Sequence, residues 1–203
     1  MTALSIEGAW EVTPQQRGDE RGVFMEWYRF DRLAETVGHP LRLAQANFST
    51  SAQGVVRGIH FADVPPGQGK YVSCVRGAVL DVVVDLRVGS PTFGTWDAVR
   101  LDDIDRKSVY ISEGLGHGFC ALTDGATVAY LCSEAYAPQR EHSIQPFDPD
   151  LAIEWPVEAP ILSSRDETAP SLAEAHAAGQ LPDHRACREF TADNTSAYAR
   201  RAR

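Results

Sequence analysis

Short runs of apolar residues, separated by turn-forming residues, follow one another along the middle of the chain, from about residue 42 to residue 145. The runs at 71–75 and 78–86 read as two strands of a hairpin that turns at Arg76 and Gly77. Further strands are predicted at 95–101, 108–111, 119–122 and 127–132. Many short strands at regular spacing are typical of a β-sandwich or β-barrel and not of βαβ units.

The residues before this region predict short strands and one helix. Residues 5–30 read as strands around a turn at 17–20. A short helix is expected next, because Asp31 is suited to cap its start and Gly38 to end it.

After residue 145 the chain becomes richer in proline and loses the strand pattern. One further helix is expected at 170–178, where Pro170 suits a first turn and alanines follow. The end of the chain, from about 190 to 203, predicts a flexible tail. Neither a repeat nor a long linker divides the sequence, so we expect a single domain over residues 1–203.

The composition is compatible with one globular domain. Of the 203 residues, 43% are hydrophobic and 23% are charged, which is a normal balance for a domain with a sizeable core. The formal net charge of −9 argues against a general nucleic-acid surface, because such a surface needs a basic face. A small anionic ligand is still compatible with this charge if arginines and lysines gather locally.

Neither membrane insertion nor secretion is expected from the sequence. No apolar run is long enough to span a bilayer, and the N-terminus lacks a basic region followed by an apolar core. None of the four cysteines forms a C-x-x-C pair, and buried free thiols in a reducing compartment are the simplest interpretation. We therefore expect a cytoplasmic protein without a membrane partner.

Three basic side chains around residue 60 are the strongest candidates for chemistry. A histidine between apolar residues, such as His60, is usually structural, but Arg57 precedes it and Lys70 follows at the head of a strand. In an all-β fold, alternate positions on neighbouring strands face the same side, so these side chains are expected to converge. A base, a cation and an anion-binding guanidinium are what proton abstraction beside a carbonyl requires.

Four other segments carry polar or aromatic groups that, taken singly, are more often structural. The glycines of residues 113–118 do not predict a phosphate-binding loop, because a strand follows them and not a helix, and His117 would lie in a tight turn. Tyr130 lies in an apolar strand, where tyrosine is usually a core residue. Residues 136–142 read as a polar loop, and residues 163–166 as a solvated ion pair.

Metal and nucleophilic chemistry find little support in the sequence. The six histidines include no H-x-H and no H-E-x-x-H spacing, so no metal site is expected. No G-x-S-x-G nucleophile elbow is present either. The sequence therefore favours acid–base chemistry without a metal.

Taken in chain order, these segments resemble the dTDP-4-dehydrorhamnose 3,5-epimerase family over roughly residues 5 to 180. The similarity rests on a series of short motifs in the order of the family: 19–26, 45–49, 57–61, 68–70, 76–87, 113–119, Tyr130, 136–141 and 162–166. Residues 64–66 and 136–142 are most similar to members that serve antibiotic deoxysugar pathways.

This resemblance implies a fold, an activity and an assembly. The fold would be all-β, a cupin-type jelly-roll barrel with a few short helices. The protein would be a homodimer that acts on dTDP-4-keto-6-deoxyglucose, a dTDP-linked 4-keto-6-deoxyhexose, without a metal or an organic cofactor.

The resemblance also implies roles for individual residues. His60 would be the base, and Asp166 would orient it. Tyr130 would be the acid on the opposite face of the sugar, and Lys70 would stabilise the enolate oxygen. The remaining family positions would bind the substrate, the arginines at the diphosphate or sugar and the two aromatic residues at the thymine: Arg21, Phe24, Glu26, Gln45, Asn47, Arg57, His117, Tyr136, Glu141 and Arg165.

This chain departs from the family pattern at two places. The family usually carries lysine where Arg165 stands, which keeps the charge but alters the geometry. It often carries a glutamine where this chain has Ala62 and Asp63, which bears on the placement of the sugar.

Two other functions are compatible with the same motifs. An isomerase of this fold would move the ketone from C4 to C3 with the same histidine base and no opposed acid, and a sugar-nucleotide-binding jelly roll would catalyse nothing. Tyr130 favours epimerisation, because inversion needs a proton carrier on each face. Similarity to antibiotic-pathway members favours inversion at C3 alone or predominantly, with inversion at both C3 and C5 as the alternative.

Overall fold

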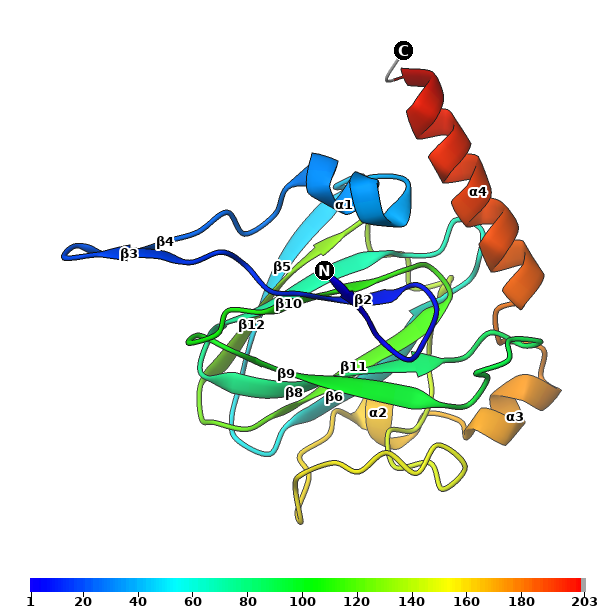
Figure 1. The fold of residues 1–203 in the computed structure, drawn as a ribbon. Helices are drawn as coiled ribbons and strands as arrows, with labels where there is room; N and C mark the ends of the chain where they lie inside the picture. The colour runs from blue at the N-terminus through cyan, green and yellow to red at the C-terminus, as the bar shows by residue number, and fades with distance from the viewer. Residues whose placement is uncertain (202–203) are drawn as a thin grey trace.

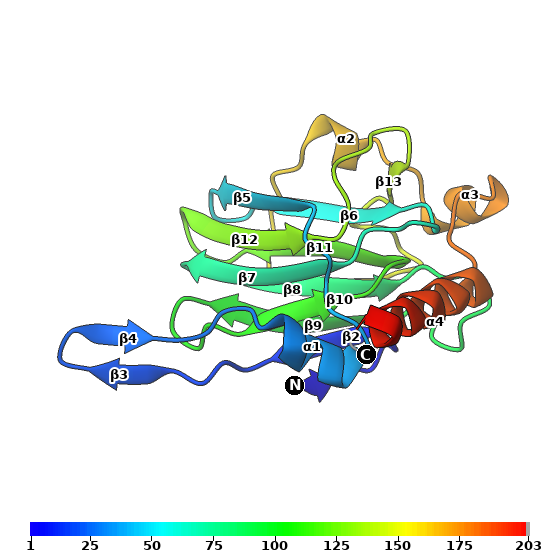
Figure 2. The ribbon, with the colours of Figure 1, turned by 90° about the horizontal axis from the view of Figure 1, so that it is seen from above.

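The computed structural model describes residues 1–201, which form two antiparallel sheets packed face to face, with helices outside them (Figures 1 and 2). One sheet has the strand order β1-β2-β10-β7-β12-β5 and the other has the order β13-β6-β11-β8-β9, while β3 and β4 form a separate hairpin. The strands are β1 Thr2–Ala3, β2 Ala9–Val12, β3 Arg17–Asp19, β4 Gly22–Phe24, β5 Gln45–Ser51, β6 Val56–Ala62, β7 Lys70–Arg76, β8 Ala78–Asp85, β9 Trp96–Asp102, β10 Ser108–Ile111, β11 Leu115–Ala121, β12 Ala126–Cys132 and β13 Glu141–Ser143.

The two sheets confirm the predicted jelly roll, but they form an open sandwich and not the predicted barrel. Within residues 1–201, no strand of one sheet pairs with a strand of the other. The predicted hairpin at 71–86 was wrong for the same reason: β7 pairs with β10 and β12, whereas β8 pairs with β9 and β11. Gly77, with a φ of +72°, turns the chain from one sheet to the other.

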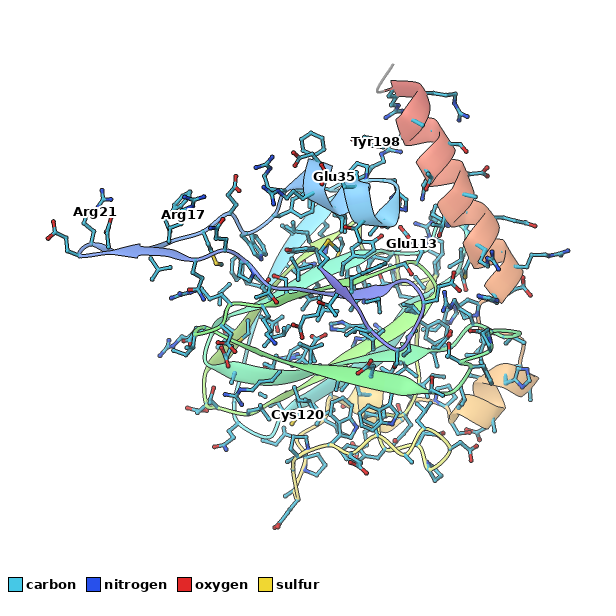
Figure 3. All side chains as sticks on the ribbon, in the orientation of Figure 1. Arg17, Arg21, Glu35, Glu113, Cys120 and Tyr198 are labelled. Carbon is cyan, nitrogen blue, oxygen red and sulfur yellow. The ribbon has the colours of Figure 1, made fainter. Side chains whose placement is uncertain are left out.

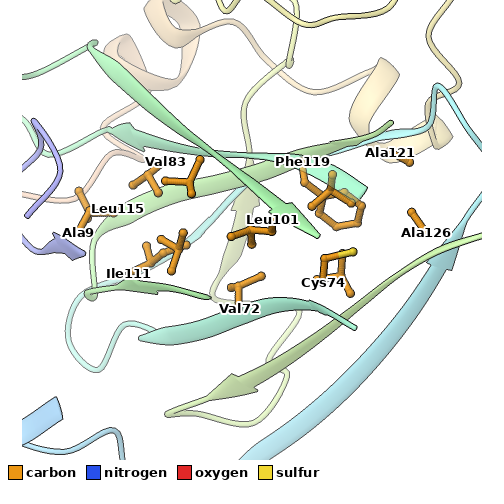
Figure 4. Close-up of a cluster of buried hydrophobic side chains, with 14 of the residues drawn as sticks. Ala9, Val72, Cys74, Val83, Leu101, Ile111, Leu115, Phe119, Ala121 and Ala126 are labelled. Carbon is orange, nitrogen blue, oxygen red and sulfur yellow. The ribbon is translucent and has the colours of Figure 1, made fainter. Parts of the chain in front are cut away.

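Alternating side chains of both sheets form the main hydrophobic core between them (Figure 4). Val72 and Cys74 of the six-stranded sheet meet Val83 and Leu101 of the five-stranded sheet in this cluster. Lys70 continues the inward row of Val72 and Cys74 to the start of β7. A polar region therefore adjoins the core at that end of the strand. All four cysteines are free and buried, as the sequence indicated.

The chain after residue 144 covers the outer face of the five-stranded sheet. Leu151, Trp155 and Leu172 pack there against Val82 and Val84 of β8. Strand β8 is therefore buried on both faces, which explains why its sequence is almost continuously apolar and does not alternate.

Helix α1, Phe30–Val37, packs Leu33 against tyrosines on the outer face of the six-stranded sheet. The helix ends at Gly38, as predicted, and Gly38 adopts the left-handed conformation. Its start differs from the prediction, because Arg29 is the N-cap residue and Asp31 lies in the first turn. The Asp31 carboxylate accepts a hydrogen bond from the Arg29 side chain and favours the helix through its dipole, not as a cap.

The β3-β4 hairpin projects from the body of the fold (Figures 1 and 2). Every residue of both strands is exposed. Its turn falls at Glu20 and Arg21 and not at 17–20, since Arg17 already pairs with Phe24 in the hairpin.

Three helices follow the sheets: α2 Ser164–Glu167, α3 Leu172–Ala177 and α4 His184–Arg201. The α3 helix confirms the prediction of a helix within 170–178. Ser171 caps it in a capping box with Glu174, so Pro170 precedes the cap and is not in the first turn. No helix within residues 1–201 combines the length and the apolar character needed to cross a membrane.

Helix α4 takes the place of the flexible tail predicted from about residue 190. The Asp183 carboxylate accepts a backbone hydrogen bond at the helix start, Cys187 is buried, and Thr195 packs closely on the loop after α1. The prediction was wrong because these few anchors are hidden in a segment that is otherwise polar. Residues 202–203, the end of the predicted tail, lie outside the described residues.

Candidate active site

A β-bulge in β6 places Arg57 and His60 on the same face of the strand. Strict alternation would direct two residues three apart to opposite faces. Between them, however, β6 carries one residue more than its partner strand β11. Arg57 is paired with Phe119 of β11, and the Phe119 side chain belongs to the core between the sheets. Gly58 lies at this bulge with a φ of +117°, and a Cβ there would come within 2.6 Å of the Gly118 Cα. The bulge thus turns both side chains toward the space between the sheets.

His60 is paired with Asp166. Its Nε2 lies 2.6 Å from Asp166 Oδ1, and the imidazole is 34% exposed whereas the carboxylate side chain is 3% exposed. Asp166 comes from α2, where its backbone N–H donates to the side chain of the N-cap residue Ser163. An ionised Asp166 accepts the Nε2 proton of a neutral His60, which leaves the lone pair on Nδ1.

The electrostatic surroundings keep this imidazole neutral at neutral pH. Burial lowers the pKa of His60, Asp166 opposes this shift, and the charges of Lys70 and Arg165 add to it. Burial acts to raise the pKa of Asp166, but the hydrogen bond with His60 and its other bonds outweigh burial, and the pKa is lowered. The pair therefore consists of a neutral imidazole and a carboxylate.

Lys70 is a partly buried cation that forms no salt bridge with a described residue. It is the first residue of β7 and pairs with Cys132 of β12. Among residues 1–201, no carboxylate forms a salt bridge with it. Burial lowers the pKa of Lys70, while Cys132, Glu141 and Asp81 oppose this shift. Such an ammonium is suited to meet negative charge on a ligand.

Tyr130 and His60 come from opposite sheets. Tyr130 belongs to β12 of the six-stranded sheet and packs against the core between the sheets, whereas His60 belongs to β6 of the five-stranded sheet. Burial raises the pKa of Tyr130, Cys132 raises it further, and Arg57 acts against this shift. The phenol therefore keeps its proton at neutral pH. Two groups able to exchange protons thus come from the two layers of the fold, each at an inward-facing position of its strand.

A second histidine–carboxylate pair lies beside the first. His117 of β11 is in register with His60, and its Nε2 lies 2.8 Å from Asp81 Oδ2. Asp81 is completely buried in β8, and it was not among the residues predicted for the site. The signal was present, because Asp81 is the one acid inside the apolar run 78–84, and a charged group there is costly unless it is paired.

Hydrogen bonds join strand β5 to the loop that borders this region. Gln45 Nε2 donates to Asn47 Oδ1 at 2.8 Å, and Gln45 Oε1 accepts the Tyr136 backbone N–H at 2.8 Å. Glu141 Oε1 accepts a backbone N–H of the same loop at 3.1 Å. The loop at 133–140 is thus held by two of the predicted site residues, and it presents an exposed Tyr136.

Arg165 of α2 is tied to β13, next to His60. Its Nε donates to Ser143 Oγ at 3.0 Å and its Nη2 donates to the Glu141 carbonyl at 3.2 Å. Ser143 is in register with His60. Arg57, on the other side of His60 in the sequence, donates through Nε to a serine of β5 at 3.1 Å. Arg165 therefore lies beside the histidine, and Arg57 lies on the same face of β6.

The structure does not bring Arg21, Phe24 and Glu26 to this region of the same chain. Arg21 forms an ion pair with Asp19 in the hairpin, Phe24 is 67% exposed, and Glu26 is paired with Arg29. Figure 3 shows Arg21 on the projecting hairpin, away from the sheets. Within one chain, these three predicted substrate-binding residues therefore lie apart from the other members of the predicted set.

No metal-binding cluster accompanies these groups. Over residues 1–201, no three side chains of histidine, cysteine, aspartate or glutamate are placed to hold a metal ion. The fold and the site together define a cupin-type jelly-roll protein with a histidine of one sheet paired to an aspartate of α2, a tyrosine in the other sheet and a lysine that forms no salt bridge with a described residue.

A family model described as dTDP-4-dehydrorhamnose 3,5-epimerase matches residues 3–174. The chain belongs to this family, which confirms the resemblance found in the sequence and the expectation of an epimerase.

The relatives include both single-site and double-site epimerases. A dTDP-4-dehydrorhamnose 3,5-epimerase of Mycolicibacterium smegmatis is 63% identical over 194 residues, which cover 94% of this chain and 95% of the relative. The crystal structure of NovW, a 4-keto-6-deoxy sugar epimerase from the novobiocin biosynthetic gene cluster of Streptomyces spheroides, is 63% identical, with a TM-score of 0.90 over 92% of this chain and 94% of that one. ChmJ, a 3'-monoepimerase from Streptomyces bikiniensis in complex with dTDP-quinovose, is 51% identical, with a TM-score of 0.93 over 96% and 99%.

Proposed function

We propose that the protein epimerises dTDP-4-keto-6-deoxyglucose, predominantly at C3, in the formation of an antibiotic deoxysugar. The proposal rests mainly on one observation: His60, which is paired with Asp166, and Tyr130 lie in opposite sheets. An inversion removes a proton from one face of a carbon and returns a proton to the other face, so it needs two proton carriers on opposite sides. The relatives that act on 4-keto-6-deoxy sugars support the choice of substrate.

In the first step, His60 takes the proton from the carbon next to the C4 ketone. The neutral imidazole receives it on Nδ1, because Nε2 already donates to Asp166. The electrons of the broken C–H bond move into the ring and form an enolate with its charge on the C4 oxygen. Asp166 stabilises the imidazolium that results.

Lys70 stabilises the enolate. Its ammonium has no salt-bridge partner among the described residues, so it is available to the developing negative charge on oxygen. The partial burial of Lys70 strengthens this interaction, because a charge that is partly removed from bulk water is less screened. This role requires Lys70 to be protonated, and a pKa lowered by burial sets the upper end of the working pH range.

In the second step, Tyr130 donates its phenolic proton to the opposite face of the same carbon. The enolate electrons form the new C–H bond, the ketone is restored, and the tyrosinate left behind regains a proton from solvent while His60 releases one. Because burial raises the pKa of Tyr130, the phenol is fully protonated when the enolate forms.

The polar groups around this pair would bind the sugar nucleotide. Arg57, on the same face of β6 as His60, and Arg165, tied to the neighbouring strand β13, supply positive charge for the diphosphate or the sugar, although the protein as a whole is acidic. The other residues of the chain proposed to line the site are Gln45, Asn47, His117, Tyr136 and Glu141.

A homodimer would explain why Arg21, Phe24 and Glu26 lie apart from the site residues of their own chain. Phe48 of β5 and Val75 of β7 are exposed on the outer face of the six-stranded sheet, and Phe24 is exposed on the hairpin. A second copy would cover these apolar side chains. The projecting hairpin would then carry Arg21, Phe24 and Glu26 to the substrate site of the other copy.

Two further expectations belong to this proposal. Residues 1–203 form a single domain, which is supported by the packing of the chain after residue 144 on the five-stranded sheet. The protein acts in the cytoplasm, which is supported by four buried cysteines that form no disulfide.

Incubation with dTDP-4-keto-6-deoxyglucose in D₂O, followed by proton NMR of the sugar, tests the function. We expect deuterium at C3, with almost none at C5, and inversion of C3. Migration of the ketone to C3 would instead identify a 3,4-ketoisomerase, and a sugar without deuterium would identify a binding protein. Rapid label at both carbons would overturn the preference for C3 and retain the epimerase.

Two variants separate the roles in the same experiment. His60→Asn should abolish both exchange and inversion, with a loss of about 10²–10⁴-fold or more and little change in nucleotide affinity. Tyr130→Phe should retain exchange at C3 while inversion is lost, because His60 returns deuterium to the face from which it took the proton. Equal loss of exchange in both variants would contradict the assignment of Tyr130 to the second step.

A further inference from the structure

The position of Lys70 depends on its backbone, because no described carboxylate holds its side chain. The residues just before it are Gly67, Gln68 and Gly69, and they lead directly into β7. Whatever holds this segment therefore determines where the ammonium enters the site.

The side chain of Glu113 lies directly against this segment. A Cβ at Gly67 would come within 2.5 Å of the Glu113 Cβ, and a Cβ at Gly69 would come within 2.9 Å of Glu113 Oε1. The φ of Gly67 is +68°, so glycine is also the residue that its backbone conformation favours. The two glycines together provide the room that the Glu113 side chain occupies.

A set of hydrogen bonds connects Glu113 to the residue that precedes Lys70. Ser133 Oγ donates to Glu113 Oε1 at 3.4 Å and accepts the Gly69 N–H at 2.8 Å. The Ser133 backbone N–H in turn donates to the Gly69 carbonyl at 2.9 Å. Both backbone groups of Gly69 are thus bound to Ser133, and the hydroxyl that binds one of them is itself oriented by Glu113.

Glu113 destabilises the fold at this position. It is 5% exposed, it forms no salt bridge with a described residue, and its Oε2 has no hydrogen-bond partner. Burial raises the pKa of Glu113, although its hydrogen bonds act against the shift. A buried, incompletely paired carboxyl group destabilises a fold compared with an apolar residue of similar size. Figure 3 shows it at the end of the sheets that faces α4, away from the hairpin.

We infer that Glu113 is a positioning residue for the epimerisation: through Ser133 and the two glycines it fixes the segment that carries Lys70 to the enolate oxygen. This inference rests on the proposed function of Lys70. Displacement of a group that stabilises a transition state by about 1 Å lowers the rate on the order of 100-fold. Loss of Glu113 should therefore act on turnover and not on the binding of the nucleotide.

The test compares Glu113→Ala with Glu113→Gln in the full-length protein. Glutamine keeps the shape and an oxygen that accepts from Ser133, whereas alanine leaves a cavity beneath Gly67 and Gly69. For Glu113→Ala we expect kcat to fall about 10- to 100-fold with little change in KM, and for Glu113→Gln we expect kcat to stay near the wild-type value. The alkaline limb of the rate profile should move to higher pH in the alanine variant, because a loosened Lys70 is better solvated and its pKa rises.

A matched control separates positioning from loss of stability. Asp148 is also a buried carboxylate, and it accepts the backbone N–H groups of Leu151 and Leu172 in the chain packed on the outside of the five-stranded sheet. Asp148→Ala should lower Tm, while the folded enzyme keeps the wild-type kcat and alkaline limb. A Glu113→Ala variant with the same behaviour as Asp148→Ala would overturn the inference. Absence of deuterium exchange in the wild-type protein would instead overturn the proposed function.

Discussion

His60 Nε2 and Asp166 Oδ1 are 2.6 Å apart, although their residues are separated by 106 positions in the chain. The imidazole lies in β6, and the carboxylate comes from the short helix α2 that packs on this strand. The partner removes ambiguity about the tautomer, since a carboxylate accepts the Nε2 proton and leaves Nδ1 basic. Asp166 also raises the pKa of the imidazole and so opposes burial, which lowers this pKa.

Asp166→Asn should lower kcat by about 10²–10⁴-fold and shift the acidic limb of the rate profile to lower pH. The carboxylate raises the pKa of His60, so its replacement by a neutral amide lowers that pKa further. The base must be unprotonated, and activity therefore rises with pH through the pKa of His60, which already lies below its usual value of about 6.5. A profile of kcat/KM against pH for both proteins measures the shift. An acidic limb that stays in place would contradict the coupling between the two residues.

The sequence identified candidate residues of the site, but it did not predict the geometry that assembles them. His60, Lys70 and Tyr130 were proposed as site residues from motifs, and the structure places them on inward-facing positions of three strands. Alternation alone could not place Arg57 beside His60, because residues three apart face opposite sides unless a bulge intervenes. A bulge depends on pairing with β11, which is a long-range relationship.

The errors in the fold prediction also arise from contacts between residues that are distant in the sequence. Strands β7 and β8 are adjacent in sequence, so local turn chemistry predicted a hairpin, whereas the jelly roll assigns them to different sheets. Helix α4 lacks a strong apolar stripe and is held by few contacts, such as the buried Cys187. Asp81 was overlooked because its partner, His117, is distant in the sequence. Local patterns predict elements well, but pairing across the chain needs the folded structure.

Gly58→Ala should destabilise the protein and reduce activity more than its stability loss explains. The backbone at Gly58 has a φ of +117°, and the added Cβ would come within 2.7 Å of the His117 carbonyl oxygen. Strain and overpacking of this kind cost about 1–3 kcal/mol. Relief by a change in the bulge would turn Arg57 away from His60. Thermal unfolding measures the first effect, and kcat/KM at a temperature where the variant is folded measures the second. Wild-type values of both would show that the bulge tolerates a side chain.

Chelators should leave the rate unchanged. In the proposed mechanism the enolate charge is met by Lys70, and the proton moves through His60 and Tyr130, so no step calls for a cation. The measurement is the rate of C3 inversion after dialysis against EDTA, compared with an untreated sample. Activity that disappears and returns with one added metal would show that Lys70 is not the main stabiliser of the enolate.

The hairpin and the histidine should complement each other between two copies of the chain. One variant, His60→Asn, lacks the base but keeps a normal hairpin. A second variant, with Arg21→Ala and Phe24→Ala, keeps the base but lacks two hairpin side chains. Each variant alone should be nearly inactive, because every site in its homodimer lacks either the base or the hairpin side chains. Light scattering at micromolar concentration should give the mass of a dimer for both.

Mixing the two variants after brief unfolding and refolding distinguishes a shared site from a self-contained one. If the hairpin serves the other copy, each mixed dimer has one complete site, in which the intact His60 of one chain meets the intact Phe24 of the other. Random reassociation makes half of the dimers mixed, and activity should return to about one quarter of the wild-type value. If the hairpin served its own chain, both sites of a mixed dimer would be defective, and mixing would restore nothing. Recovery near one quarter therefore follows from exchange of the hairpin between copies, whereas a monomer mass or an inactive mixture would refute it.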